Sequence, residues 1–297
     1  EVVLLQAGDC AFMFRLALKT AKQFGAKLVI YNTEGYYFKD YDYFRGAGLA
    51  HLLYPVFRKN LKNATRAAYR KADHCIFNCD ALNEDFGKEF TMCSDVIYTA
   101  TDIEPAESNI SRGDAFVASY AGNLGVGRGK GLVDVAIALH SIDSNCYLDV
   151  YGSIPDDGVK ALFDSCQSLR FHGRVAYEQV KKLMSDSDLL LHVESFEPYY
   201  RKDLKYAFST KIADCLASNT CFLIYAPEEF AETQYLMRNN AAYVACSMQA
   251  LKEQLQHILS DRGARRRYCK NATELALNNH NLENAVIRFQ KILCDVV

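Results

Sequence analysis

The sequence predicts an α/β protein built on parallel β-sheets. Short apolar runs, of which residues 188–193 are one example, alternate along the chain with longer stretches of helical periodicity, and this alternation is typical of strand–helix–strand units. The runs are apolar at nearly every position, as expected for strands covered by helices on both faces. A chain of 297 residues is long enough for two domains, each with its own core.

The first half of the chain shows this alternation from its start. We expect strands at residues 2–6, 27–31, 75–78 and 94–98 and helices at residues 12–23 and 80–90, with a further helical region before residue 75. A dinucleotide-type half normally opens with a strand and a glycine-rich turn, and the only candidate for that turn is residues 7–10, around Gly8. We therefore expect the opening strands of this half to be absent, so that the N-terminal domain is incomplete.

The second half repeats the alternation after a polar segment that contains Pro105. This interruption places the domain boundary at residue 108, which divides the chain into residues 1–108 and 109–280. Strands of the second domain are expected at residues 116–121, 146–151, 168–171, 188–193 and 221–225, and helices at residues 131–140, 157–164, 177–184 and 210–217. Helical periodicity then continues through residues 249–259, 265–277 and 282–293.

The composition argues against several classes of protein. The formal net charge is −2 at pH 7, so we expect no binding of nucleic acid through bulk charge. The eleven cysteines include no C-x-x-C pair, which favours buried thiols in a reducing compartment over a zinc or redox-active site. The sequence shows neither a signal peptide nor a spanning stretch of about 20 apolar residues. These features together predict a soluble, cytoplasmic protein.

Two segments of the first half each have two interpretations. The helical region before residue 75 carries Arg58, Lys62, Arg66 and Arg70 at four-residue intervals. This stripe is either a solvated helix face or a contact with the anionic inner face of a membrane. Residues 36–44 combine aromatic rings with carboxylates, and they form either a packed loop or a sugar-binding loop.

A glycine-rich segment follows the strand expected at residues 116–121. It runs from Gly122 to Gly131, and glycines in this place let backbone N–H groups approach a phosphate closely. Gly131 follows Lys130 where a Walker A loop needs serine or threonine, and the dinucleotide fingerprint fails as well. The segment is either a flexible turn or a basic loop in which Arg128 and Lys130 are free to contact an anion.

A second candidate for phosphate binding follows the strand expected at residues 188–193. Glu197 comes just after the end of this strand, where ligands of open α/β sheets collect. Ser209 and Thr210 can cap a helix that carries Lys211, so that free N–H groups, the helix dipole and a fixed cation meet in one place. A phosphate or a diphosphate is the ligand that this arrangement predicts.

Metal binding is not expected. Two Asp-x-Asp strings occur, at residues 40–42 and 186–188. The first lies in the aromatic loop and the second at the start of an apolar strand, so neither offers a hard cation a set of solvent-facing oxygens. We expect neither a metal nor another cofactor.

Several motifs of the second half occur in a fixed order. They are the glycine-rich segment from Gly122 to Gly131, Tyr151-Gly152-Ser153, Phe171-His172-Gly173-Arg174-Val175, Ser195-Phe196-Glu197 and residues 209–217. In this order, over residues 116–231, they resemble the C-terminal domain of family 4 glycosyltransferases, which are retaining enzymes of GT-B fold. The resemblance implies two Rossmann-like domains that face each other across a cleft, with residues 281–297 as a helix that crosses back to the N-terminal domain.

The resemblance also implies a role for each motif. The donor diphosphate would be bound by Gly122, Asn123, Arg128, Lys130 and the N–H groups of Ser209, Thr210 and Lys211. Asp214 would contact the ribose, and Gly173, Arg174 and Val175 would border the base. Glu197 would meet the donor sugar and would form the catalytic set with Lys130 and Arg128.

The implied activity is transfer of a sugar from a nucleotide-diphosphate sugar to a glycan or lipid-linked acceptor, as in polysaccharide biosynthesis. Such an enzyme is a hexosyltransferase of class EC 2.4 that retains the anomeric configuration without a metal. The chain departs from the family in two ways, because the usual spacing between its two acidic residues is lost and Asn123 replaces an arginine. A non-catalytic nucleotide-sugar-binding module, a nucleotide-sugar epimerase of the same fold and a dehydrogenase are the alternatives.

Overall fold

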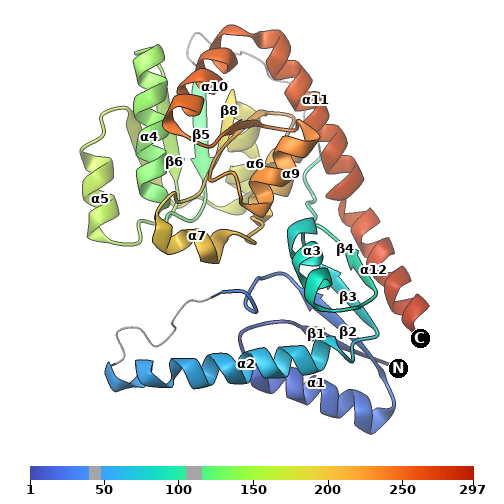
Figure 1. Ribbon diagram of the computed structural model, residues 1–297. Helices are drawn as coiled ribbons and strands as arrows, with labels where there is room; N and C mark the ends of the chain where they lie inside the picture. The colour runs from blue at the N-terminus through green and yellow to red at the C-terminus, as the bar shows by residue number, and fades with distance from the viewer. Residues whose placement is uncertain (40–47, 105–115) are drawn as a thin grey trace. The chain divides into compact units, whose positions relative to one another are not determined.

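The computed structural model describes residues 1–39, 48–104 and 116–297 and divides the chain into two units (Figure 1). Unit 1 comprises Glu1–Thr99, Lys205–Phe208 and Glu283–Val297, and unit 2 comprises Ala100–Leu204 and Ser209–Leu282. The predicted boundary at residue 108, the string at residues 40–42 and the aromatic loop beyond residue 39 lie outside the described residues.

Unit 1 is built on a four-stranded parallel sheet with the order β1-β2-β3-β4. The strands are β1 (Val2–Gln6), β2 (Lys27–Asn32), β3 (His74–Phe77) and β4 (Ser94–Val96). All four occur where the sequence predicts them. The last ends two residues early, and Ile97 and Tyr98 follow it as buried residues outside the strand.

Four α-helices and one 3-10 helix are described in unit 1. They are α1 (Ala11–Phe24), the 3-10 helix η1 (Gly48–Leu53), α2 (Tyr54–Tyr69), α3 (Asp80–Glu89) and α12 (Leu282–Val296). Helix α1 ends at Gly25, whose φ of 61° is left-handed and therefore suits glycine. Helix α12 packs on the sheet through Ile292, which contacts a cluster that contains Val29 and Ile76.

The core between α2, α3 and β3 is aromatic. The ring of Phe86 lies 4.6 Å from that of Tyr69 and 5.3 Å from that of Phe77. Tyr206 belongs to the same unit, because its ring lies 5.2 Å from that of Phe38 and its hydroxyl donates to Asp85. The short segment Lys205–Phe208 is therefore packed on unit 1, although its chain neighbours belong to unit 2.

Unit 2 is built on a six-stranded parallel sheet with the order β10-β9-β8-β5-β6-β7. The strands are β5 (Val117–Ala121), β6 (Tyr147–Tyr151), β7 (Leu169–Gly173), β8 (Leu189–Val193), β9 (Cys221–Tyr225) and β10 (Tyr243–Ala245). When β5 to β10 are renumbered 1 to 6 and the sheet is followed from β7 to β10, the order is 3-2-1-4-5-6, which is that of dinucleotide-binding domains. The strand order reverses between β5 and β8. Strand β10 is not predicted from the sequence, although residues 241–246 are an apolar run.

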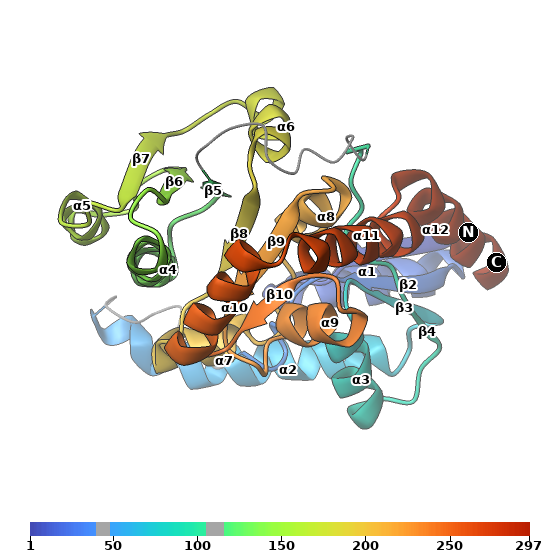
Figure 2. The same ribbon diagram turned by 90° about the horizontal axis from the view of Figure 1, so that it is seen from above.

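Eight helices are described in unit 2. They are α4 (Arg128–Ile142), α5 (Asp157–Asp164), α6 (Tyr177–Asp186), α7 (Pro198–Leu204), α8 (Thr210–Ala217), α9 (Ala231–Asn239), α10 (Met248–Ser260) and α11 (Arg262–Asn279). Figure 2 shows α4 and α5 on one side of strands β5 to β7 and α6 on the other. Helices α7 and α9 are not predicted from the sequence, and α7 has no buried residue that would give it a periodic pattern.

None of the helices in the described ranges combines the length and the apolar character that crossing a bilayer requires.

We predict that Phe86→Ala destabilises unit 1 by about 3–5 kcal/mol, because it removes a fully buried ring and leaves a cavity between aromatic neighbours. Phe86 is 1% exposed, whereas Phe24 on α1 is 62% exposed. Phe24→Ala is the matched control and should change the free energy of unfolding by no more than about 0.5 kcal/mol. Urea unfolding followed by circular dichroism measures both, and equal effects would contradict the assignment of Phe86 to the core.

Candidate functional site

The candidate site lies in unit 2 at the reversal of strand order between β5 and β8. The loops after β5, β6 and β7 meet there through their backbones, since Gly122 N donates to Tyr151 O at 2.9 Å and Gly152 N donates to Gly173 O at 2.9 Å. A Cβ atom on Gly152 would lie 2.3 Å from the Gly122 carbonyl oxygen. The close approach of these loops therefore requires glycine at position 152.

These loops and the start of α8 surround a hollow of about 470 Å³. Seven of the predicted site residues line it, namely Gly122, Asn123, Arg174, Val175, Thr210, Lys211 and Asp214. Tyr177, Val180 and Met184 of α6 add an apolar wall beside Arg174 and Val175. A larger depression of about 660 Å³ lies in unit 1 around α1 and β2, but no predicted site residue lines it.

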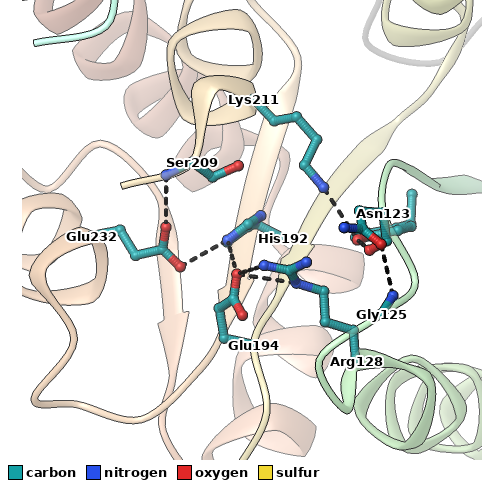
Figure 3. Close-up of polar contacts among 9 residues, drawn as sticks. Asn123, Gly125, Arg128, His192, Glu194, Ser209, Lys211 and Glu232 are labelled. Carbon is teal, nitrogen blue, oxygen red and sulfur yellow. Dashed lines mark hydrogen bonds and ion pairs between the residues drawn. The ribbon is translucent and has the colours of Figure 1, made fainter. Parts of the chain in front are cut away.

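The Lys211 ammonium is held against the glycine-rich segment. Its Nζ lies 3.1 Å from the hydroxyl of Tyr120 and 4.5 Å from the centre of that ring (Figure 3). A Cβ on Gly122 would lie 2.0 Å from this Nζ, so Gly122 leaves the space that the lysine occupies. The Asn123 side chain accepts the Gly125 N–H at 2.8 Å and thereby shapes the turn.

The sequence predicts Arg128 as a loop residue that is free to contact an anion, and the structure differs on both points. Arg128 is not free in a loop, because α4 already begins at this residue and the guanidinium pairs with Glu194, which follows β8. Arg128 Nε and Nη2 lie 3.1 and 2.5 Å from Glu194 Oε1. Burial raises the pKa of Glu194, but His192 and Arg128 outweigh burial and hold this pKa below its ordinary value.

Glu194 belongs to a buried polar network that the sequence does not reveal. We define the network as Arg128, Glu194, His192, Glu232 and the Ser209 N–H (Figure 3). His192 Nε2 lies 3.2 Å from Glu194 Oε1 and 2.7 Å from Glu232 Oε1, and Ser209 N donates to Glu232 Oε2 at 3.2 Å. The only sequence signal is the pair of ionisable residues at positions 192 and 194 of an otherwise apolar strand region.

This network corrects one part of the predicted phosphate site. The Ser209 N–H already has an acceptor in Glu232, so it is not available to a diphosphate in this conformation. Thr210 and Lys211 open α8, and N–H groups in the first turn of a helix have no acceptor within the helix. Thr210 and Lys211 both line the hollow.

Lys130 and Glu197 do not line the hollow in the described structure. Lys130 is exposed in the first turn of α4, close to Asp134, whose pKa is raised by burial against the opposing charge of Lys130. Glu197 is also exposed, and its N–H donates to the Ser195 hydroxyl at 3.2 Å. Their catalytic roles therefore stay predictions.

Asp214 lies on the wall of the hollow and already accepts one hydrogen bond. The Thr101 hydroxyl donates to Asp214 Oδ1 at 2.6 Å, and the neighbouring Asp102 pairs with Lys181 at 3.0 Å. Burial raises the pKa of Asp214, the Thr101 hydroxyl opposes this rise, and the charge of Asp102 adds to it. The second carboxylate oxygen can accept from a sugar hydroxyl.

One group of side chains in the described ranges could hold a metal. Ligand atoms of His192, Glu194 and Glu232 all lie within 4.8 Å of one another. The Arg128 guanidinium and the Ser209 N–H already compensate the two carboxylates, so a divalent cation would have to enter beside a fixed positive charge. The charge distribution thus favours the ion-pair network over a metal site.

The two parallel sheets, the second of them with a hollow at its strand-order reversal, define a protein of the Rossmann-like α/β class, as the sequence predicts. The chain belongs to the glycosyl transferase-like family, whose sequence pattern matches residues 136–291. The match covers more than half of the chain and includes α8 with Lys211 and Asp214. No curated protein matches the chain.

Solved structures share the fold over nearly the whole chain. Sucrose-phosphate synthase from Thermosynechococcus elongatus has a TM-score of 0.71 at 14% identity, over 99% of this chain and 73% of that one. HepE from Anabaena in complex with UDP-glucose has a TM-score of 0.67 at 16% identity, over 98% and 78%. A glycosyltransferase from Rickettsia africae has a TM-score of 0.62 at 12% identity, over 99% and 97%. These likenesses establish the fold, and the assignment to family 4 stays a prediction.

We predict that Gly152→Ala disrupts the hollow, since the new Cβ would meet a backbone carbonyl that has no rotamer through which to move away. The expected result is loss of nucleotide binding together with destabilisation of about 1–3 kcal/mol from overpacking. Gly87→Ala on α3 is the control, because nothing lies within 4 Å of its Cβ position, and alanine in a helix should stabilise by up to about 1 kcal/mol. Thermal unfolding with and without UDP measures both; undiminished UDP binding by Gly152→Ala would contradict the close approach.

Proposed function

We propose that the chain transfers a sugar from a nucleotide-diphosphate sugar to a glycan or lipid-linked acceptor. The observation that carries this proposal is the single hollow that brings together the Lys211 ammonium, the first turn of α8, the Gly122 turn and the Asp214 carboxylate. A cation and helix N–H groups suit a diphosphate, and a carboxylate beside them suits ribose hydroxyls. Arg174 and Val175, with the apolar residues of α6, supply a place for the base.

The proposed chemistry is stabilisation of charge on the leaving group. Cleavage of the sugar–phosphate bond develops negative charge on the β-phosphate, and a preorganised donor aimed at that charge lowers the barrier by about 3–4 kcal/mol. Lys211 is the residue best placed for this, because Tyr120 and Gly122 hold its ammonium in position. We assign Lys130 to the same phosphate and Glu197 to the donor sugar, as the resemblance to family 4 implies.

Retention of configuration and metal independence are part of the same proposal. In family 4 the leaving phosphate is expected to help deprotonate the acceptor, so no separate base is needed on the protein. Positive side chains and helix amides take the place of a metal at the diphosphate. Family 4 resemblance supports both points, and product stereochemistry and activity in the presence of chelator test them.

The first donor to test is UDP-glucose, because the Anabaena HepE structure contains that compound. A non-catalytic nucleotide-sugar-binding module is the second candidate, favoured by Asn123 in place of the arginine usual in family 4. A binding module would show a UDP-dependent thermal shift without release of sugar from the donor. An epimerase would instead convert the donor sugar without an added acceptor, which product analysis detects.

We predict that Lys211→Ala lowers kcat by about 10²–10³-fold, as removal of one well-aimed donor does in other active sites. It should also reduce the thermal shift produced by UDP. Lys202→Ala is the matched control, since Lys202 is an exposed lysine on the neighbouring helix α7. The assignment fails if Lys211→Ala keeps both full turnover and the full UDP shift.

We also propose that unit 1 contacts an anionic membrane surface, where a lipid-linked acceptor would be located. Two residues of the predicted basic stripe have internal partners, because Arg58 donates to the carbonyl of Tyr36 at 2.9 Å and Arg66 pairs with Glu89 at 3.2 Å. Lys62 Nζ lies 5.8 Å from the centre of the Tyr37 ring, and Arg70 is exposed at the end of α2. At its other end, α2 begins beside a group of exposed apolar side chains on η1 and in its own first turn. These are Leu49, Leu52, Leu53 and Val56. Apolar residues beside basic ones suit the membrane interface.

We predict that the double variant Leu52→Asp, Leu53→Asp lowers binding to vesicles that contain phosphatidylserine. The two leucines are 62% and 61% exposed, and Ile137 on α4 is 55% exposed. Ile137→Asp is therefore the control for loss of an exposed apolar residue elsewhere. Co-sedimentation at low and high salt measures the binding, and equal retention of all variants would contradict the membrane contact.

A further inference from the structure

The buried polar network joins two elements that carry the proposed donor site. Arg128 begins α4 directly after the glycine-rich turn, and Ser209 immediately precedes α8, on which Lys211 stands. His192 and Glu232 lie between these ends and contact neither the hollow nor solvent, since each is 1% exposed. A shift of the start of α4 would therefore act, through these contacts, on the start of α8, and a shift of α8 would act on α4.

The network is balanced in charge only when His192 carries a second ring proton. Arg128 and a protonated His192 supply two positive charges, and Glu194 and Glu232 supply two negative ones. Loss of that proton would leave one buried carboxylate without a full counter-charge, which is costly at this depth. The ring N–H at Nε2 donates toward Glu232 Oε1 at 2.7 Å.

Fold stability does not account for so many buried charges. Apolar residues of similar volume stabilise a core as well as a buried ion pair does, or better. The directional contacts of the network, in contrast, determine where α4 and α8 begin relative to each other. A function in positioning explains why polar groups occupy this place.

We propose that His192 and Glu232 are positioning residues of the donor site: through Glu194, Arg128 and the Ser209 N–H they hold the start of α4 and the first turn of α8 in the arrangement that receives the diphosphate. This inference rests on the proposed function. Neither residue contacts the donor, so both act through their neighbours.

The direction of one pKa supports this role. Burial lowers the pKa of His192, but the charges of Glu232 and Glu194 outweigh burial and raise it above its ordinary value. The charged groups around this imidazole are Glu194 beyond the end of β8, Glu232 on α9 and, through Glu194, Arg128 on α4. Because the folded pKa is raised, folding favours the imidazolium, which is lost as the pH rises through that pKa.

The variant Glu232→Gln tests the proposal with almost no change in volume. The two carboxylate oxygens of Glu232 serve different donors, His192 at Oε1 and the Ser209 N–H at Oε2. Glutamine has one oxygen and therefore can accept from only one of them. Glu228→Gln is the control, because Glu228 is an exposed glutamate in the loop that leads to α9.

The measurements are the Kd for UDP by calorimetry and kcat with UDP-glucose, both taken well below the unfolding temperature. We expect Glu232→Gln to weaken UDP binding and to lower kcat/KM by about 10- to 100-fold, as small misplacements of a site do. The fall of wild-type activity at alkaline pH should move to lower pH in Glu232→Gln, because removal of the carboxylate lowers the pKa of His192. A residue with only a structural role would lower the unfolding temperature and leave these values for the folded protein unchanged.

A second variant acts at the other end of the same contact. Ser209 has φ −66° and ψ 134°, which the backbone of proline adopts without strain. Ser209→Pro therefore removes the N–H, and because its ring carbon takes the place of the amide hydrogen, the Glu232 carboxylate has to withdraw from this position. Ser209→Ala is the reference with which Ser209→Pro is compared, because it removes the hydroxyl and keeps the N–H. In a double-mutant cycle, Ser209→Pro and Glu232→Gln should be non-additive, because both break the same hydrogen bond.

The outcomes separate this inference from the proposed function. If wild-type protein binds UDP and Glu232→Gln binds it equally well with an unchanged pH profile, the positioning role is wrong and the proposed function stands. If the cycle with Ser209→Pro is additive, the Ser209 N–H contributes independently of Glu232 and the inference is likewise overturned.

If the wild type does not bind any nucleotide diphosphate, both the function and the inference are overturned. One equivalent of zinc lost on Glu232→Gln would replace the network with a metal site and overturn the inference.

Discussion

The structure of unit 2 depends on neutralising a buried carboxylate. Glu194 follows β8 at the strand-order reversal and is 1% exposed, and an unpaired charge in such a place would cost several kcal/mol. Arg128 and His192 provide the compensation. This requirement brings the first residue of α4, the end of β8 and the start of α9 together. It places rigid elements around the point where a ligand of an open α/β sheet binds.

The need to neutralise buried carboxylates also determines which positive groups of the site remain available. Arg128 is engaged with Glu194, and the Ser209 N–H is engaged with Glu232. Lys211 is left to face the hollow, and its ammonium reaches that position because Gly122 has no side chain. The proposed phosphate-binding site thus consists of an outer layer of residues that line the hollow and a buried layer that contacts the outer one.

Most secondary structure of the chain could be predicted from hydrophobic periodicity. Strands such as β8 and β9 are buried at every position, so their apolar runs are a direct consequence of the parallel sheet. The prediction failed where this signal is weak. Helix α7 has no buried residue, and α4 begins at Arg128 within a segment whose glycines indicated a loop.

The sequence by itself determined the α/β class, the order of the motifs and the placement of Lys211 and Asp214 on one short helix, because each of these follows from local pattern and spacing. The GT-B fold was implied by the resemblance of these motifs to family 4 glycosyltransferases. Only the tertiary structure decided which charges are free. Arg128 meets Glu194 across 66 positions of the chain and His192 meets Glu232 across 40. No local pattern encodes such partners, since side chains this far apart in sequence come into contact only when strands and helices pack.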